Sequence, residues 1–338
     1  MRHAKKTFYL LILVSWLAGT GCSRQDIVEF GHGDLAQLKK STLRLNSDLV
    51  QMRSFVEVLA GYTEELYRAG GRVTADFNPK DYTLFQEKLY YKSRDDGGAV
   101  YVATHFGRDP RVAKARARLT PFFTMLMKPL VDGSPAVAQA YFNSADNCSY
   151  VYPYFDILQV IPPEMDVRTF NFYFLADEKH NPSRGSVWVG TPYVDPAGQG
   201  WMVSVIAPVY DGDTLLGVVG TDLTVHTLTQ KYLESTEKPL LLVNHDGLVI
   251  ATSSEAARIL HLPIQEGHKY IEAVNADTFQ PDKFNLLKSP RKPIRALARS
   301  IIIEKQSRGW IDIHGERQLV IAAPVPETNW TLWQIIAE

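Results

Sequence analysis

Residues 186–224 read SVWVGTPYVDPAGQGWMVSVIAPVYDGDTLLGVVGTDLT. Apolar and polar residues alternate in three segments, 186–195, 199–211 and 214–224, and such alternation is typical of β-strands that bury one face. Residues that favour tight turns separate these segments, namely Pro196-Ala197-Gly198 and Asp211-Gly212-Asp213. The stretch therefore predicts a three-stranded antiparallel meander.

Helix and strand patterns alternate on both sides of the meander. The expected elements are a strand at 99–106, a helix at 111–133, a strand, turn and strand at 137–154, and a short helix at 227–234. A mixed order of this kind is typical of an α+β lobe. We assign this first lobe to residues 71–235.

A second, smaller set of strands starts at residues 238–253, KPLLLVNHDGLVIATS, where Asp246-Gly247 predicts a hairpin turn. Three more strands are expected within residues 309–338. We assign this second lobe to residues 236–338. The predicted fold class is α+β, with a long N-terminal helix followed by two lobes, each an antiparallel sheet flanked by helices.

The long helix is expected at residues 34–70, after a polar spacer at 23–33. Asp34 or Gly33 can cap its start, and Gly70-Gly71 ends it. At 1.5 Å per residue it would be roughly 54 Å long. Its apolar residues recur at steps of three and four: Leu35, Leu38, Leu45, Leu49, Met52, Val56, Leu59, Thr63 and Leu66.

Two arrangements fit a helix of this length. It can pack as a spine along both lobes, or it can pair with a second copy of the chain as a coiled coil and form a homodimer. Phe55, Tyr62 and Tyr67 widen the apolar face beyond a two-position seam. This width favours the spine.

Residues 1–22 have the pattern of an export signal, with a basic start, an apolar run at 8–17 and small residues before Cys22. The apolar run is too short to span a bilayer, and no later stretch is long enough. The small residues before the cysteine resemble a lipobox, although Gly19 stands where leucine is usual. We expect lipidation at Cys22, and Ser23 favours the outer membrane over the inner membrane as the site of anchoring on the periplasmic side.

The bulk composition excludes several classes. The chain has 338 residues, 45% of them hydrophobic, which is an ordinary globular balance. Its 36 basic and 37 acidic side chains give a formal net charge of -1, so no positive field favours nucleic acid. After export Cys148 is the one cysteine in the folded body, so we expect no internal disulfide.

Signals of catalysis are missing from the sequence. It has no glycine-rich phosphate loop, no His-Glu-x-x-His and no Cys-x-x-Cys, and Ser186 and Ser204 lack the context of a nucleophilic serine. The nine histidines are scattered along the chain. We expect no enzymatic activity, no metal site and no cofactor.

The order and spacing of several motifs resemble the double Cache domain, a family of extracytoplasmic sensors, over roughly residues 35–338. These motifs are Trp188-x4-Tyr193-x-Asp195, Pro208-Val209-Tyr210, GVVGTD at 217–222, YFNSADNCSYVYP at 141–153 and LLLVNHDGLVIATS at 240–253. The resemblance implies two PAS-like (Cache) lobes on a spine helix, with a small ligand held in the membrane-distal lobe. Most members continue into a transmembrane helix and a chemoreceptor, kinase or cyclase output.

The resemblance also implies a ligand site, which we assign to Tyr173, Trp188, Tyr193, Asp195, Tyr210 and Asp222. In relatives that bind amines or amino acids, the acids that match Asp195 and Asp222 face an ammonium group beside an aromatic wall, and aromatic faces attract cations. Structural roles are the alternative. Asp195 can open the turn that follows it, Asp222 can cap the next helix, and Trp188 and Tyr193 can be core aromatics.

The amino-acid-binding members carry an arginine that grips the ligand carboxylate. In residues 168–176, RTFNFYFLA, Tyr173 matches the tyrosine of that motif and no arginine occupies the matching place. This departure disfavours an α-amino acid and favours an amine, unless Arg168 or Arg184 reaches the ligand from another direction.

The sequence therefore predicts a lipid-anchored extracytoplasmic sensor that binds a small molecule, amine-like or amino-acid-like. It would signal, or deliver its ligand, through a separate membrane kinase, chemoreceptor or transporter. The alternative is an envelope interaction or scaffold lipoprotein that keeps the Cache fold without a functional pocket.

Overall fold

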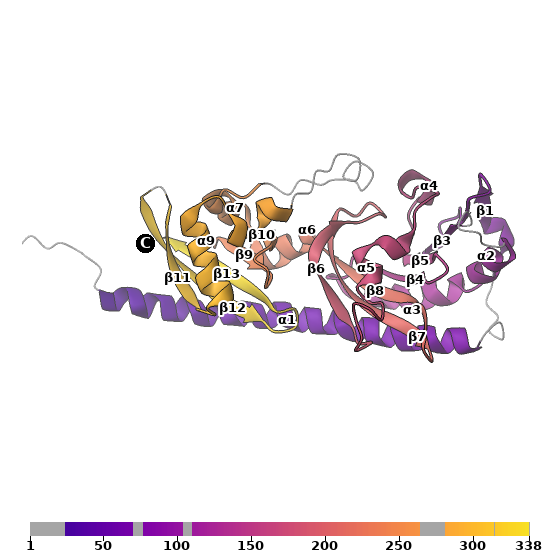
Figure 1. The fold of residues 1–338 in the computed structure, drawn as a ribbon, viewed down its shortest axis with the longest axis horizontal. Helices are drawn as coiled ribbons and strands as arrows, with labels where there is room; N and C mark the ends of the chain where they lie inside the picture. The colour runs from indigo at the N-terminus through magenta and orange to yellow at the C-terminus, as the bar shows by residue number, and fades with distance from the viewer. Residues whose placement is uncertain (1–23, 70–76, 104–109, 264–280, 314, 338) are drawn as a thin grey trace, which may run out of the picture.

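The computed structural model describes residues 24–69, 77–103, 110–263, 281–313 and 315–337 (Figure 1). The expected export signal and Cys22 lie outside these residues. Within them, no helix combines the length and the apolar character needed to cross a membrane.

The long helix α1 spans Arg24–Ala69 and lies along the whole length of the molecule (Figure 1). It begins before the expected start at residue 34, so the expected polar spacer is helical from Arg24 onward. Gly33 was expected as a possible cap at the helix start, but it lies inside α1, where a glycine costs only about 1 kcal/mol. Such a cost does not end a helix that tertiary contacts stabilise further along.

One face of α1 is buried at alternating steps of four and three residues, by Leu38, Thr42, Leu45, Leu49, Met52, Val56, Leu59 and Thr63. Strands β7 and β8 of the first lobe and β12 and β13 of the second pack against this helix. Its apolar residues belong to one hydrophobic cluster with residues of both sheets. The prediction of a spine is confirmed.

The first lobe is built on an eight-stranded antiparallel sheet in the order β1-β2-β3-β5-β4-β8-β7-β6. The strands are β1 Tyr82–Phe85, β2 Leu89–Lys92, β3 Ala99–Ala103, β4 Gln139–Ser144, β5 Cys148–Tyr152, β6 Val187–Val194, β7 Trp201–Asp211 and β8 Thr214–Thr224. β6, β7 and β8 are consecutive and antiparallel, as the alternating pattern predicted. β1 and β2 were not predicted from the sequence.

The two faces of this sheet are covered differently. α1 and α3 (Thr120–Asp132) pack on one face, together with α2 (Pro110–Ala117) near β2 and β3. The short helices α4 (Ile157–Val160), η3 (Val167–Thr169) and α5 (Asn171–Phe174) contribute to a separate cluster on the other face. The candidate functional site lies on this second face, beside these short helices.

The helix expected at 111–133 is two helices, α2 and α3. Pro121 occupies the first turn of α3. If α2 and α3 formed one continuous helix, the ring of Pro121 would clash with the carbonyl of Ala117. Proline also has no N–H group that could donate to this carbonyl. The chain therefore breaks at Arg118–Leu119, and the hydroxyl of Tyr82 donates to the Ala117 carbonyl instead, at 3.4 Å.

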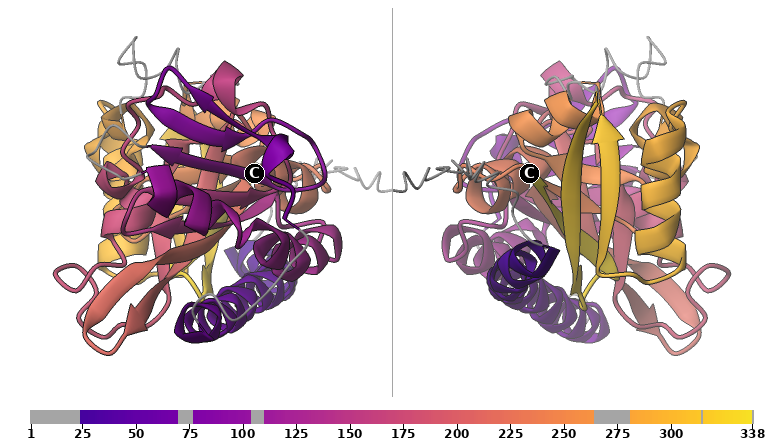
Figure 2. Two further views of the ribbon diagram at one scale, coloured as in Figure 1. Left: turned by 90° about the vertical axis from the view of Figure 1, so that its right-hand side faces the viewer. Right: turned by 90° about the vertical axis from the view of Figure 1, so that its left-hand side faces the viewer.

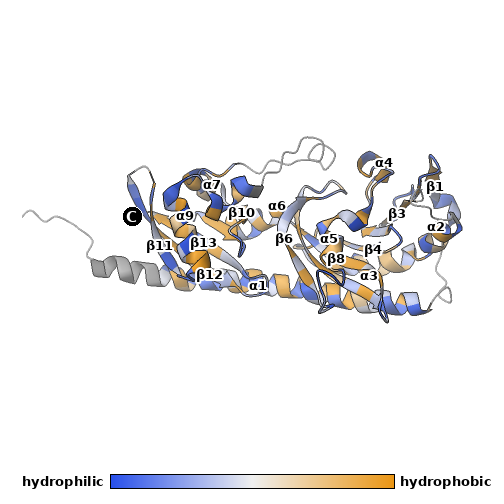
Figure 3. Ribbon diagram, viewed as in Figure 1, coloured by the Kyte–Doolittle hydropathy of each residue, from blue (hydrophilic) through white to orange (hydrophobic). Residues whose placement is uncertain are grey.

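The second lobe is a five-stranded antiparallel sheet in the order β10-β9-β13-β12-β11. The strands are β9 Leu240–Val243, β10 Val249–Thr252, β11 Arg308–Ile313, β12 Glu316–Val325 and β13 Trp330–Ala337. This lobe also contains the helices α7 (Ser254–Leu260), η5 (Pro281–Phe284), η6 (Leu286–Lys288), α9 (Lys292–Ala298) and η7 (Arg299–Ile303). The chain enters the lobe through α6 (Val225–Leu228) and η4 (Thr229–Leu233). The strands are rich in apolar residues (Figure 3). Gly247 lies in the predicted hairpin turn with a φ of 85°.

A polar junction ties α1 to both lobes around Glu327, which lies between β12 and β13. Its carboxylate accepts from Arg53 Nε of α1 at 2.7 Å and from Trp188 Nε1 of β6 at 3.0 Å. The Trp188 ring also meets Trp330 of β13 edge to face, with 6.0 Å between the centroids. The two lobes are thus in direct contact through β6.

Truncation of the buried face of α1 tests its role as the common core. Leu49→Ala should lower the free energy of unfolding by about 3 kcal/mol, because Leu49 is fully buried and the cavity left behind adds to the lost transfer energy. Leu43→Ala on the same helix, where the side chain is 66% exposed, should change it by less than about 0.5 kcal/mol. Equal losses, measured by chemical denaturation, would contradict this account of α1.

Trp188→Phe removes one donor to Glu327 and keeps an aromatic ring. We expect a loss of about 1 kcal/mol in the free energy of unfolding and a lower melting temperature, since the Glu327 carboxylate then loses one of its two donors and keeps only Arg53. Trp310→Phe is the matched control, because Trp310 lies 38% exposed on β11. A Trp188→Phe protein that melts at the same temperature as the Trp310→Phe protein would argue against the junction.

Candidate functional site

The strand register places three polar residues in one row across the first sheet. Gln139 of β4 is the partner of Asp222 of β8, and Asp222 is the partner of Ser204 of β7. Gln139 Nε2 donates to Asp222 Oδ2 at 2.6 Å, and Ser204 Oγ donates to Asp222 Oδ1 at 2.6 Å. Both oxygens of the Asp222 carboxylate are therefore held by neighbouring strands.

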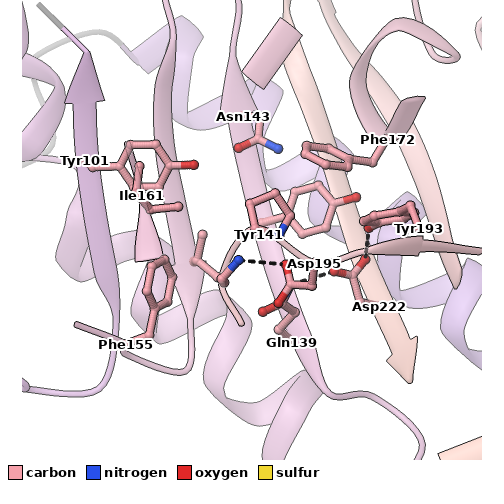
Figure 4. A pocket seen from close by; sticks show the side chains of 13 residues that line it. Tyr101, Gln139, Tyr141, Asn143, Phe155, Ile161, Phe172, Tyr193, Asp195 and Asp222 are labelled. Atoms are coloured by element: carbon pink, nitrogen blue, oxygen red, sulfur yellow. Dashed lines mark hydrogen bonds between the residues drawn. The ribbon is translucent and has the colours of Figure 1, made fainter. Parts of the chain in front are cut away.

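Asp195 meets this row from the end of β6. Gln139 Nε2 also donates to Asp195 Oδ1, at 3.1 Å, so one amide group bridges the two carboxylates (Figure 4). The Asp195 carboxylate accepts from the backbone N–H groups of Ala197 and Gln199, each at 3.0 Å. The expected turn role of Asp195 is thus present, and it fixes the carboxylate beside Asp222.

Tyr193 completes the hydrogen-bonded group. Its hydroxyl lies 2.6 Å from Ser204 Oγ and 3.3 Å from Asp222 Oδ1. The register between β6 and β7 shifts between Val189 and Tyr193, next to Pro192 on this edge strand. An irregularity of this kind changes the direction of the side chains that follow it.

The expected capping role of Asp222 is wrong. Thr224 caps α6, with its hydroxyl oxygen accepting from the Thr227 N–H at 2.8 Å. Asp222 lies inside β8 with its side chain directed at Gln139 and Ser204. It is therefore available for another role.

The two carboxylates are buried without a cation. Asp195 is 3% exposed and Asp222 is 1% exposed, and neither forms an ion pair with any described residue. Burial, followed by the charge of Asp195, raises the pKa of Asp222 to about 7, and burial raises the pKa of Asp195. A bound cation would remove this penalty, because it favours the ionised form of both groups.

A cavity of about 30 Å³ lies beside this row, and aromatic, apolar and polar side chains line it. The lining residues are Tyr101, Gln139, Tyr141, Asn143, Val151, Phe155, Ile161, Phe172, Tyr193, Asp195, Pro196, Ala197 and Asp222 (Figure 4). That volume holds only one or two water molecules. A larger molecule requires its covering residues to move apart.

Gly220 gives the cavity wall its shape. It is the strand partner of Tyr141, and a Cβ atom at Gly220 would lie 2.3 Å from Tyr141 Cζ. Only glycine therefore lets the Tyr141 ring lie across β8, beside the carboxylate of Asp222. The second glycine of the GVVGTD motif, Gly220, is therefore required by the packing of Tyr141.

The structure brings three of the six expected site residues together, Tyr193, Asp195 and Asp222. Trp188, expected in the aromatic wall, lies in the lobe junction instead. Tyr173 is buried in α5, and burial raises its pKa to about 12, but it does not line the cavity. Tyr210 lies toward the β7–β8 turn under the guanidinium of Arg184, whose Cζ is 4.3 Å from the ring centroid.

Neither candidate arginine reaches the cavity. Arg168 donates to both oxygens of Asp166, at 2.7 and 2.6 Å. Arg184 pairs with Asp213 at 3.1 Å, at the turn between β7 and β8. The lining described above contains no arginine, lysine or histidine.

Five residues of the site were not predicted from the sequence, namely Gln139, Ser204, Tyr141, Asn143 and Phe172. One signal was present. Gln139 and Asn143 are polar residues four apart in a strand whose every residue is buried, so they share one face with Tyr141. Phe172, adjacent to the expected Tyr173, packs against Tyr193 with 5.2 Å between ring centroids and supplies the aromatic wall.

No protein-family model and no curated protein sequence matches this chain significantly. Solved structures do match its shape. The ligand-binding domain of Mlp24 with asparagine has a TM-score of 0.51 and 16% identity, over 94% of this chain and 96% of that chain. The extracellular domain of soHK1S-Z6, a protein assigned as a histidine kinase, has a TM-score of 0.52 and 15% identity, over 93% of this chain and 96% of that one.

A third match is the ligand-binding domain of the Pseudomonas aeruginosa PAO1 amino acid chemoreceptor PctB in complex with L-Arg, with a TM-score of 0.49 and 14% identity, over 93% and 97% of the two chains. Identities this low establish the fold alone. The long helix, the two antiparallel sheets and their flanking helices agree with the fold that the motifs resembled. The chain has the fold of a double Cache sensor domain.

Proposed function

We propose that the chain is an extracytoplasmic sensor that binds a small molecule with an ammonium group in the cavity of the first lobe. The observation that carries this proposal is the pair of buried carboxylates, Asp195 and Asp222, bridged by Gln139 and without an ion-pair partner among the described residues. Buried acids are costly unless a cation pairs with them. An ammonium group between them would provide that cation.

The surroundings of the carboxylates support the same ligand chemistry. Phe172, Tyr193 and Tyr141 lie beside the acids, and aromatic faces attract a cation with about 0.5–2 kcal/mol. The carboxylates of Asp195 and Asp222 both line the cavity, and each carboxylate oxygen can accept more than one hydrogen bond. The site thus offers charge, hydrogen-bond acceptors and aromatic surface to the same group.

The lipid anchor and the partner are part of the proposal. The pattern of residues 1–22 supports export and acylation of Cys22, with the outer membrane favoured by Ser23. A lipid-anchored sensor would pass occupancy, or its ligand, to a membrane kinase, chemoreceptor or transporter. The exposed side of α1, with Leu43, Val58 and Tyr62, offers a surface for a homodimer or for that partner.

A scaffold without a ligand is the second candidate, and the small volume of the cavity favours it. On this alternative the acid pair is a remnant, and the outer surface of α1 binds an envelope partner. The two candidates differ in what Asp222 does. Only the sensor loses a small-molecule interaction when this carboxylate is replaced.

Asp222→Asn separates the two candidates. The ligand probes are primary amines, screened by thermal shift and then by calorimetry at pH 8. We expect binding to weaken by more than 100-fold, since the variant removes a buried partner of the ammonium group. The ligand-free variant should be at least as stable as the parent, because the amide carries no buried charge.

Asp211→Asn is the matched control, because Asp211 lies exposed at the other end of the same pair of strands. It should leave amine binding and stability unchanged. If the parent protein binds no amine, the sensor proposal in this form is wrong. If Asp222→Asn binds amines as well as Asp211→Asn does, the acid pair is not the ammonium site.

Stability should fall as pH rises from about 4 to 7. The folded-state pKa of Asp222, about 7, lies above its ordinary value of 3.8, so in this window the folded protein retains a proton that the unfolded chain releases. The stabilisation is greatest near the lower limit and is lost by about pH 7. Melting temperatures measured between pH 4 and 7 should fall more for the parent than for Asp222→Asn. Equal pH dependence of the two melting temperatures would contradict this prediction.

A further inference from the structure

The cavity contains a second polar side chain that the acid pair does not use. Asn143 lies on β4 and is 4% exposed, and its side chain lines the cavity. Its carboxamide forms no hydrogen bond with any residue in the described part of the chain. An amide has two N–H donors and an acceptor oxygen, and a buried one needs partners. Its exposure to the cavity leaves those groups available to a bound molecule.

The strand geometry separates Asn143 from the acids. Gln139, Tyr141 and Asn143 occupy alternate positions of β4 and therefore lie on one face, with the Tyr141 ring between the other two (Figure 4). Four residues of strand span about 13 Å. The cavity thus has the bridged carboxylates at one end and a neutral amide at the other.

The charge of the lining residues restricts which group of a ligand can bind next to Asn143. The thirteen residues around the cavity include two acids and no lysine, arginine or histidine. A carboxylate on the ligand would gain no counter-charge there and would be repelled by Asp195 and Asp222. A neutral amide or hydroxyl can both donate to and accept from the Asn143 carboxamide.

We propose that Asn143 is a specificity-determining residue, which selects amines that carry a neutral hydrogen-bonding group at the end remote from the ammonium. The inference rests on the proposed function, because it assumes that the ammonium group lies at Asp195 and Asp222. It goes further by assigning the opposite end of the ligand. The resulting class is a linear ω-amino amide or amino alcohol, and it excludes amino acids with a free carboxylate.

The test uses a matched series of probes with one ammonium group and different remote ends. The probes are pentylamine, 5-aminopentan-1-ol, 5-aminopentanamide, 5-aminopentanoate and 1,5-diaminopentane, together with their four- and six-carbon homologues. Calorimetry at pH 8 measures each with the parent protein, Asn143→Leu and Asn143→Asp. Leucine keeps the branched shape of asparagine without its hydrogen bonds, and aspartate keeps the shape and adds a charge.

We expect the parent to bind the amide or the alcohol of one chain length about tenfold more tightly than the alkylamine, which corresponds to one hydrogen bond. Asn143→Leu should remove this preference while alkylamine binding persists. Asn143→Asp should make the diamine the tightest ligand of the series, because the new carboxylate pairs with its second ammonium. The aminopentanoate should bind most weakly to the parent.

Two results overturn the inference in distinguishable ways. If the parent binds amines and Asp222→Asn does not, but Asn143→Leu keeps the preference for amide over alkyl, the role of Asn143 is wrong and the sensor proposal remains. If the parent binds none of the probes, the ammonium site itself is wrong. A single cooperative melting transition of each ligand-free variant shows that it folds. Asn143→Asp should melt below the parent, since it adds a third buried acid to the cavity.

Discussion

The continuous buried face of α1 is the constraint on which the rest of the structure depends. Its residues alternate at steps of four and three from Leu38 to Thr63, and both sheets pack against them. Neither sheet could bury its helix-facing apolar surface without this helix, because the hydrophobic cluster that contains α1 runs through both lobes. Figure 2, with its two views along the long axis, shows the helix beside the sheets at the edge of the molecule.

Because α1 packs against one face of the first sheet, the candidate site can lie on the opposite face. That face holds a row of polar residues that costs stability, since two carboxylates are buried beside each other and the pKa of Asp222 rises to about 7. Packing on α1 stabilises the sheet enough to tolerate this cost. Because no described residue forms an ion pair with Asp195 or Asp222, the proposed ammonium ligand accounts for this cost better than folding does.

The sequence predicts the elements of this fold better than its site. Alternation over 186–224 predicts three strands, and apolar steps predict the spine, because both patterns follow from local geometry. The break between α2 and α3 could also have been inferred from Pro121. Gln139 and Ser204 could not be assigned to the site, since their place beside Asp222 depends on the register between three strands. Trp188 was expected at the ligand, and only the packing of the two lobes shows that it contacts Glu327.

The small volume of the cavity has a kinetic consequence. A space of about 30 Å³ admits no molecule with more than a few non-hydrogen atoms until some of its lining residues move apart. Association would then proceed at the frequency of that opening rather than at the rate of diffusion. Dissociation would require the same opening. On the proposed function, the rate of this opening would therefore set the shortest time over which the protein can follow a change in ligand concentration.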